Sequence, residues 1–331
     1  MFKPSFPYFF MLKISSLVVC LSLLFGWACG PALADYPDRP LRLIVPFAPA
    51  GTVDGIARLF ASEFTKNLGQ TVVVENKAGS GGALGILAAI NAPADGYTLL
   101  LGNIATASAP ALYPKMGINL KLLDPLTLIG RSAYVLVLRN DFPSKNLSEL
   151  IALLKANPGK YNYSSAGAGS AIHLAAELFK SKALVDVLHV PYKGAGPAMN
   201  ALYSGDVEMM FGSVSELKPQ ILSKKMRPIA VTSLARSLVL PEVPSFAESG
   251  IKDYDVPGWY GVYLPVRTPV EVLKRLREAA DVTLKSQGLQ QLLKRYEMEP
   301  VSGGPREAGE LLEAEAKRWS EVISKANITA E

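Results

Sequence analysis

Residues 41–54 read LRLIVPFAPAGTVD, and this stretch decides the fold. Its short apolar run predicts a buried strand, Pro46 and Gly51 predict a turn, and a helix is expected directly afterwards. The first N–H groups of a helix have no backbone partner, so the turn can present free donors to a carboxylate or a phosphate. The stretch therefore predicts a strand, turn and helix with an anion site where the helix begins.

The same strand and helix alternation continues along the chain. Strands are expected at 41–46, 71–75, 98–102, 161–165, 187–190 and 207–211, and helices at 53–68, 147–156, 170–182 and 305–326. Thr268 is expected to be the N-cap of a further helix, with Pro269 at its first position. This alternation predicts an α/β fold with largely parallel sheets covered by helices.

The predicted elements fall into two series with no linker rich in Gly, Ser or Pro between them. We therefore expect one body of two lobes, between which the chain crosses more than once. Residues 35–135 plus 261–331 are expected to form lobe 1, and residues 136–260, including crossover strands, lobe 2.

Four turns share one design, because each follows a predicted strand and contains glycine. They are residues 47–54, 102–106, 164–173 and 191–197. In open α/β sheets ligands bind beyond the carboxyl ends of the strands. For any one of these turns, the alternative interpretation is that its glycine only permits a tight turn and has no role in binding. Together they predict a ligand cleft between two lobes that close about a hinge.

The ligand predicted for this cleft is a small carboxylate. Gly167 and Gly169 are followed by Ile172 where a dinucleotide fingerprint needs a third glycine, and no phosphate-binding G-x-x-x-x-G-K-[ST] occurs. The formal charge of the whole chain is only +5, with no run of Lys or Arg. A nucleic-acid groove therefore has no support.

The first 34 residues predict a secretory signal peptide. Lys3 and Lys13 precede an almost wholly apolar run at 14–28, and Ala-Leu-Ala stands at 32–34. The mature chain is expected to begin near Asp35 and to lie in the periplasm. The apolar run at 14–28 is shorter than the about 20 residues that an uncleaved membrane anchor needs. Attachment of a lipid at Cys29 is disfavoured by the bulky Trp27, because small residues are expected there.

Both cysteines, Cys20 and Cys29, lie within the predicted signal peptide. The exported chain would then have no thiol for a disulfide, a metal site or a nucleophile. Without Lys3 and Lys13 its formal charge falls from +5 to +3.

Seven segments are typical of one family, and they run in the order PFAPAGTVDGIAR, VVVENKAGSGG, APADGYTLLLGN, YNYSSAGAGSAIHLAAELF, HVPYKGAGPA, VEMMFGS and IAVTS. They closely resemble the extracytoplasmic receptors of tripartite tricarboxylate transporters, called Bug receptors, over residues 35–331. The resemblance implies a two-lobed periplasmic-binding-protein (Venus-flytrap) fold that needs no cofactor. It also implies a receptor that grips an organic acid and delivers it to a large and a small membrane subunit. A monomer is expected, because a hinged receptor works as a single chain.

The resemblance implies ligand contacts, by position, from both lobes. Those of the first lobe are Phe47, Thr52, Val53, Asn103, Ala105 and Thr106. Those of the second lobe are Ser164, Ser165, Ala168, Gly169, Ser170, His173, Tyr192, Lys193 and Gly212.

Four side chains have two interpretations each. His173 either donates to the ligand or packs and orients its turn, and Lys193 is either a counter-charge or a solvated residue at the cleft edge. Trp259 and Tyr260 either wall the cleft or fill the hinge core.

Three departures from the family pattern bear on the ligand. Ala50 stands where a second glycine is usual, and Asn103 and Ile104 stand where small or hydroxyl residues are common. Gly212 replaces an Asp that often follows the phenylalanine. Because that Asp could accept from an amino or hydroxyl group, its loss favours a plain mono- or dicarboxylate over an amino acid.

An exported serine hydrolase is the rival interpretation. Residues 78–82, AGSGG, are a variant of the nucleophile elbow, with Ser80 as the nucleophile. Catalysis also needs a base, but His173 and His189 are the only histidines and neither lies near the C-terminus. The interpretation as a metal enzyme has still less support, because these histidines stand 16 residues apart and no thiol is available. We therefore expect no enzymatic activity.

Overall fold

The computed structural model describes residues 36–301 and 303–330. The chain divides into two units, residues 1–38 and residues 39–331. The predicted signal peptide, with Cys20 and Cys29, lies outside the described residues. All of the described helices and strands belong to residues 39–331.

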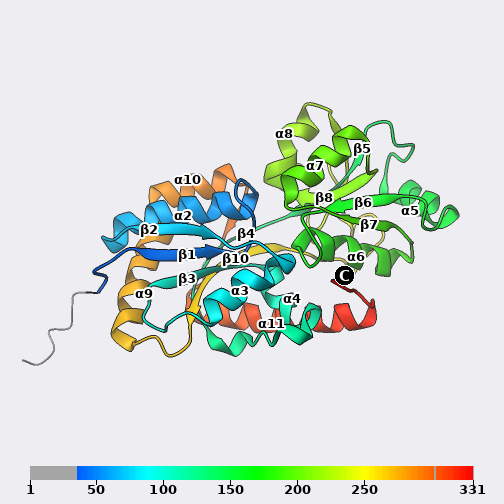
Figure 1. Cartoon of the computed structure of the whole chain (residues 1–331). Helices are drawn as coiled ribbons and strands as arrows, with labels where there is room; N and C mark the ends of the chain where they lie inside the picture. The colour runs from blue at the N-terminus through cyan, green and yellow to red at the C-terminus, as the bar shows by residue number, and fades with distance from the viewer. Residues whose placement is uncertain (1–35, 302, 331) are drawn as a thin grey trace, which may run out of the picture. The chain divides into compact units, whose positions relative to one another are not determined.

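The first lobe is built on a six-stranded sheet with the order β11-β4-β10-β3-β1-β2 (Figure 1). Its strands are β1 (Leu41–Val45), β2 (Val72–Asn76), β3 (Thr98–Gly102), β4 (Leu123–Ser132), β10 (Gly258–Pro265) and β11 (Glu299–Pro300). Its helices are α2 (Thr52–Leu68), α3 (Ala83–Ile90), α4 (Ile104–Leu112), α9 (Val270–Lys285), α10 (Gln287–Arg295) and α11 (Pro305–Lys325). Three short 3₁₀ turns are η1 (Ser80–Gly82), η2 (Pro114–Met116) and η3 (Leu120–Leu122).

The second lobe is built on a five-stranded sheet with the order β7-β6-β8-β5-β9. Its strands are β5 (Tyr134–Arg139), β6 (Asn162–Ser165), β7 (Leu188–Pro191), β8 (Met209–Ser213) and β9 (Met226–Val231). Its helices are α5 (Leu147–Ala156), α6 (Ala171–Ala183), α7 (Ala195–Ser204) and α8 (Val214–Leu222). Figure 1 shows α7 and α8 on one face of this sheet and α6 on the other.

Both sheets are mixed, although largely parallel sheets were expected. The strands joined by helices pair in parallel, as β1 does with β2 and β3, and as β6 does with β7 and β8. The strands that enter from the other lobe pair antiparallel: β10 with β3 and β4, and β5 with β8 and β9. These strands arrive directly from the neighbouring lobe rather than through a β-α-β crossover, so no helix imposes a parallel direction.

The chain changes sheets at two places. Ala133 separates β4 from β5, and residues 232–257 separate β9 from β10. Tyr134 and Val135 therefore pair in the second sheet, and residues 258–260 pair in the first sheet. These positions lie a few residues from the expected lobe boundaries.

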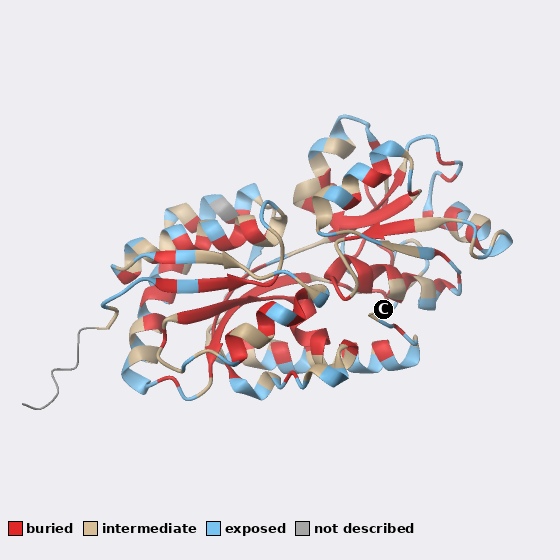
Figure 2. Ribbon diagram, viewed as in Figure 1, coloured by how far each residue is buried: buried red, intermediate tan, exposed pale blue. Residues whose placement is uncertain are grey.

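The side-chain pattern explains why the elements form where they do. On α2, Ile56, Phe60 and Phe64 recur four residues apart and are buried, and Gly69 ends the helix with a left-handed φ of 80°. On β5, Leu136 packs toward the α5 and α6 side of its sheet, whereas Val137 packs toward α7 and α8. Figure 2 shows the buried residues concentrated in the strands and on the inner faces of the helices.

The start of α9 corrects one prediction. Pro269, and not Thr268, occupies the N-cap position. The Thr268 hydroxyl instead donates to the carbonyl oxygen of Pro265 at 2.8 Å. Among the described residues, no helix combines the length and the apolar character needed to cross a membrane.

Candidate functional site

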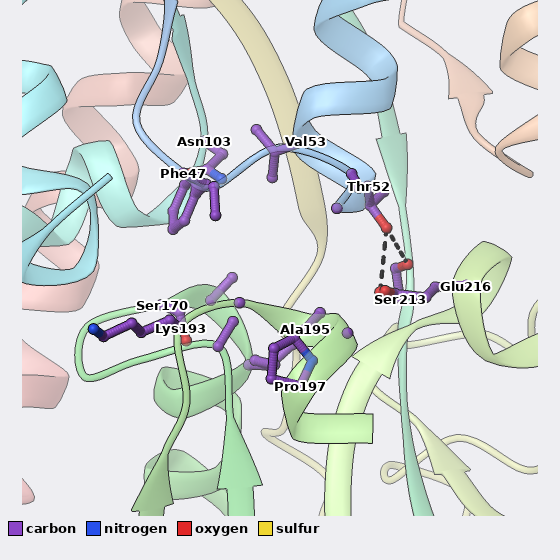
Figure 3. A pocket seen from close by; sticks show the side chains of 18 of the residues that line it. Phe47, Thr52, Val53, Asn103, Ser170, Lys193, Ala195, Pro197, Ser213 and Glu216 are labelled. Carbon is purple, nitrogen blue, oxygen red and sulfur yellow. Dashed lines mark hydrogen bonds between the residues drawn. The ribbon is translucent and has the colours of Figure 1, made fainter. Parts of the chain in front are cut away.

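A cavity of about 190 Å³ lies where the two lobes meet (Figure 3). This is smaller than the roughly 300–1,000 Å³ of pockets that hold drug-sized ligands, so it suits a small molecule. Its lining residues are Phe47, Ala48, Pro49, Ala50, Gly51, Thr52, Val53, Asn103, Tyr134, Ala166, Ser170, Ala171, Ile172, Lys193, Gly194, Ala195, Gly196, Pro197, Ser213, Glu216 and Tyr260.

Five helices begin at this cavity. Their first residues or N-caps are Thr52 for α2, Asn103 for α4, Ser170 for α6, Gly194 for α7 and Ser213 for α8. Each of these helices is the next element after a strand: the strands are β1, β3, β6, β7 and β8, in the same order. The positive ends of five helix dipoles therefore converge on one small space, which favours a negatively charged ligand.

The N-cap side chains determine which of these helices have unpaired backbone N–H groups. Asn103 and Thr106 form a capping box that satisfies the start of α4, and the Ser170 hydroxyl accepts from the N–H of His173 at the start of α6. The N-cap residues of α2, α7 and α8 make no side-chain cap bond. At the start of α8, the N–H of Val214 donates to the carbonyl oxygen of Ala133 at 3.0 Å. The first N–H groups of α2 and α7 therefore remain available to a ligand.

The first-lobe turn at 47–54 is held by the carboxylate of Asp54. This carboxylate accepts from the N–H of Ala50 at 3.0 Å, from Arg58 Nε at 2.9 Å and from Asn76 Nδ2 at 2.9 Å. Burial opposes ionisation, but these three hydrogen bonds outweigh it and lower the pKa of Asp54. Asp54 thus orders the turn rather than facing the ligand.

Ala50 adopts a left-handed backbone with φ of 69°. This is the position at which the family resemblance implies a second glycine. Alanine in this region is strained by about 1–2 kcal/mol. The hydrogen bonds of Asp54 therefore hold the turn in a backbone conformation that is unfavourable for Ala50.

Three hydrogen bonds join the two lobes near the cavity. The hydroxyls of Thr52 and Ser213 lie 3.0 Å apart, Thr52 Oγ1 donates to Glu216 Oε2 at 3.3 Å, and the Tyr113 hydroxyl donates to the carbonyl oxygen of Ala168 at 3.0 Å. The first two are drawn in Figure 3. Farther from the cavity, Lys218 of α8 forms an ion pair with Glu297. The lobes therefore meet in a closed arrangement.

Two buried tyrosines complete the lining of the cavity: Tyr134 on β5 and Tyr260 on β10. Burial raises the pKa of Tyr260 to about 12 and raises that of Tyr134 well above its usual range. Both phenols are therefore neutral and able to donate. Trp259, by contrast, is buried and does not belong to the cavity lining.

The two histidines lie behind the second-lobe turns and do not line the cavity. His173 Nδ1 accepts from the N–H of Gly169 at 3.1 Å, and His189 Nε2 lies 2.6 Å from the Ser165 hydroxyl. Their ring centroids are 4.2 Å apart. Burial lowers the pKa of His173 to about 4 and that of His189 to about 3, so both are neutral near pH 7. This geometry is that of packed histidines that orient a turn.

Six of the fifteen predicted ligand contacts line the cavity: Phe47, Thr52, Val53, Asn103, Ser170 and Lys193. Lys193 is exposed. The other nine predicted contacts are not among the residues that line the cavity. They are Ala105, Thr106, Ser164, Ser165, Ala168, Gly169, His173, Tyr192 and Gly212.

The hydrogen bonds of these residues explain their positions. The Ser164 hydroxyl donates to the carbonyl oxygen of Ala198, and the Ser165 hydroxyl pairs with His189 and accepts from Gly167. Ala105 and Thr106 are buried in the first turn of α4. These groups stabilise the turns through hydrogen bonds and packing within each lobe.

Ser213 and Glu216 are the polar lining residues that the sequence reasoning missed. Ser213 is the last residue of β8 and Glu216 lies in the first turn of α8, so they mark a fifth strand-to-helix turn. The signal was present, because Ser213 followed three residues later by Glu216 matches the S-x-x-E pattern of a helix start. Gly212 precedes them and is buried. A side chain there would point at Leu217, with its Cβ 2.6 Å from Leu217 Cδ1.

Ser80 does not lie in the cavity lining; it is exposed and has a left-handed φ of 46°. Within the described part of the chain, no group of three or more His, Cys, Asp or Glu side chains is arranged to hold a metal ion.

Comparisons with known proteins identify the family. The model of the tripartite tricarboxylate transporter family receptor matches residues 56–328. The periplasmic binding protein BugD is 34% identical, over 89% of this chain and 99% of its own, with a TM-score of 0.83.

Two further similar proteins have been solved with a ligand. Rpa4515 from R. palustris, with adipate, is 31% identical over 89% of this chain and 99% of its own, with a TM-score of 0.83. MatC from Rhodopseudomonas palustris, with bound malate, is 30% identical over 87% of this chain and 100% of its own, with a TM-score of 0.82. The chain therefore belongs to the tripartite tricarboxylate transporter receptor family, whose members are solute receptors and not enzymes.

Proposed function

We propose that this protein is a periplasmic receptor that closes its two lobes on a small organic carboxylate and delivers it to the membrane subunits of a tripartite transporter. The observation that carries the proposal is the meeting of five helix N-termini at one small cavity, three of them without a side-chain cap. The binding of adipate and malate by proteins of similar fold and sequence supports the same class of ligand.

In this proposal the ligand carboxylate accepts from the first N–H groups of α2 and α7, which face each other across the cavity. Thr52, Asn103 and Ser170 supply side-chain contacts, and Lys193 at the rim adds a counter-charge. The nine predicted contacts that do not line the cavity hold the turns in shape. The two sheet crossings, at Ala133 and at 232–257, serve as the hinge.

The binding energy required is modest. Hydrogen bonds to a charged group contribute about 1.5–3 kcal/mol each. A few of them, less the entropy of closing the lobes, reach the roughly −8 kcal/mol of a micromolar receptor. A monomer cleaved near Asp35 would be sufficient for this task.

The test is a thermal-shift screen of purified residues 35–331, stripped of bound ligand by unfolding and refolding, against mono-, di- and tricarboxylates. A ligand at about 100 times its Kd should stabilise the folded protein by about 2.7 kcal/mol. The amide analogues of the same acids are the matched controls and should give no shift. Refolded protein that responds to no acid, or equally to acids and amides, would refute the proposal.

A further inference from the structure

An acidic side chain lines a cavity whose helix dipoles favour anions. Glu216 lies in the first turn of α8 and is half-buried. Figure 3 shows it with Ser213 and Thr52 at one side of the cavity, whereas Ser170 and Lys193 lie at the other side. The two sides therefore differ in charge.

Glu216 is short of hydrogen-bond donors. Within residues 36–301 and 303–330 its carboxylate has one donor, the Thr52 hydroxyl at 3.3 Å, and no cationic partner. A carboxylate has about four acceptor positions, so the described residues leave most of the capacity of this cavity-lining group unused. Burial raises the pKa of Glu216, which indicates that the surroundings stabilise its charge poorly.

A second carboxylate from a ligand would be repelled at this side of the cavity, and a methylene group would leave Glu216 desolvated without a partner. A hydroxyl or an ammonium group would satisfy it. We infer that Glu216 accepts a hydrogen bond from such a donor on the ligand, and that the receptor therefore selects hydroxy or amino acids over acids that lack a donor. This inference rests on the proposed function.

The position of Gly212 removes the argument for a plain carboxylate. From the sequence alone, the absence of an acid at 212 predicts a site without an acceptor for an amino or hydroxyl group. A side chain at 212 would instead face Leu217 inside the second lobe, with its Cβ 2.6 Å from Leu217 Cδ1. The acceptor is supplied one turn later, by Glu216.

The first measurement is isothermal titration of the mature chain with three matched sets of acids that differ only at the second carbon. The sets are propionate, lactate and alanine; succinate, malate and aspartate; and glutarate, 2-hydroxyglutarate and glutamate. In the set that binds, the hydroxy or amino member should bind at least about tenfold more tightly than the unsubstituted acid. Preference for the hydroxy acid identifies a neutral donor, and preference for the amino acid identifies an ammonium group.

The second measurement repeats the titration with Glu216→Gln, in which the amide oxygen can still accept from Thr52. The preference for the donor-bearing acid should fall about tenfold, while the unsubstituted acid binds as well or better. Glu278→Gln neutralises an exposed acid on α9 and should leave every affinity unchanged. Thermal melts of both variants show whether a change reflects folding rather than contact.

The outcomes separate this inference from the proposed function. Tight binding of an unsubstituted or aromatic acid in preference to donor-bearing acids would overturn the role of Glu216 and leave the receptor function intact. A preference that survives in Glu216→Gln would have the same meaning. Failure of folded protein to bind any acid would overturn both.

Discussion

Replacing Gly81 with alanine should prevent the closed arrangement of the lobes. Gly81 belongs to η1 in the first lobe, and a Cβ added there would stand 2.2 Å from the carbonyl oxygen of Ala168 in the second lobe. Ordinary contacts of this kind begin near 3.4 Å. Because the obstacle is backbone and not a flexible side chain, the lobes must separate by about 1 Å at this point.

The separation weakens the hydrogen bonds that join the lobes. The Tyr113 to Ala168 bond and the contact between Thr52 and Ser213 are both 3.0 Å long. If both are lost at about 0.5–1.5 kcal/mol each, closure loses about 1–3 kcal/mol. Since closure is linked to binding, the Kd should rise about 5- to 150-fold.

Gly117→Ala is the matched control. Gly81 and Gly117 both have left-handed backbones, with φ of 57° and 65°, so alanine is strained at each by about 1–2 kcal/mol. A Cβ on Gly117, however, would meet nothing within 4 Å. Both variants should therefore lose similar stability, but only Gly81→Ala should lose affinity.

Isothermal titration with the acid identified by the thermal-shift screen measures the affinities. Small-angle scattering of the saturated proteins measures closure, and Gly81→Ala should keep a larger radius of gyration than Gly117→Ala. Equal affinities in the two variants would refute the reasoning, because the cavity would then not depend on this contact between the lobes.

Two further predictions concern the turns that frame the cavity. Burial lowers the pKa of His173 to about 4 and that of His189 to about 3, whereas unfolded histidine titrates near 6.5. The unfolded chain therefore binds more protons as the pH falls from about 6.5 toward 4, and the free energy of unfolding should decrease over this window. His189→Gln should flatten this loss in urea melts at about pH 7 and about pH 4.5, and an unchanged pH dependence would contradict the assignment. Asp54→Asn should destabilise the protein by about 1–3 kcal/mol, because the amide cannot accept from Ala50, Arg58 and Asn76 together; a chemical melt indistinguishable from the unchanged protein would show that the turn does not need the carboxylate.

Much of the local structure could be predicted from the sequence. The bounds expected for β3 and α5 are those observed, because an apolar run and an amphipathic period are properties of a short segment. The strand-to-helix turns were found for the same reason. Thr268 shows the limit of such reasoning, since its hydroxyl turned to the carbonyl oxygen of Pro265 and the helix began one residue later.

The orientation of the turn residues was not predictable in this way. Ser164 and Ser165 stand at the end of β6, as expected, but their hydroxyls pair with Ala198 and His189 inside the lobe. Which side chains of a turn face the cavity depends on partners that are distant in the sequence. Glu216 was missed because the short S-x-x-E pattern at the start of its helix does not reveal that Thr52 of the other lobe lies 3.3 Å away.

The sequence by itself determined the strand, turn and helix units, the family and the presence of helix N-termini suited to an anion, because these depend on the order of neighbouring residues. Only the tertiary structure decided the antiparallel entry of β5 and β10, the meeting of five helix N-termini at one cavity and the placement of Glu216 within it. These features arise from packing between segments that lie far apart along the chain, and no local pattern specifies which of their atoms will meet.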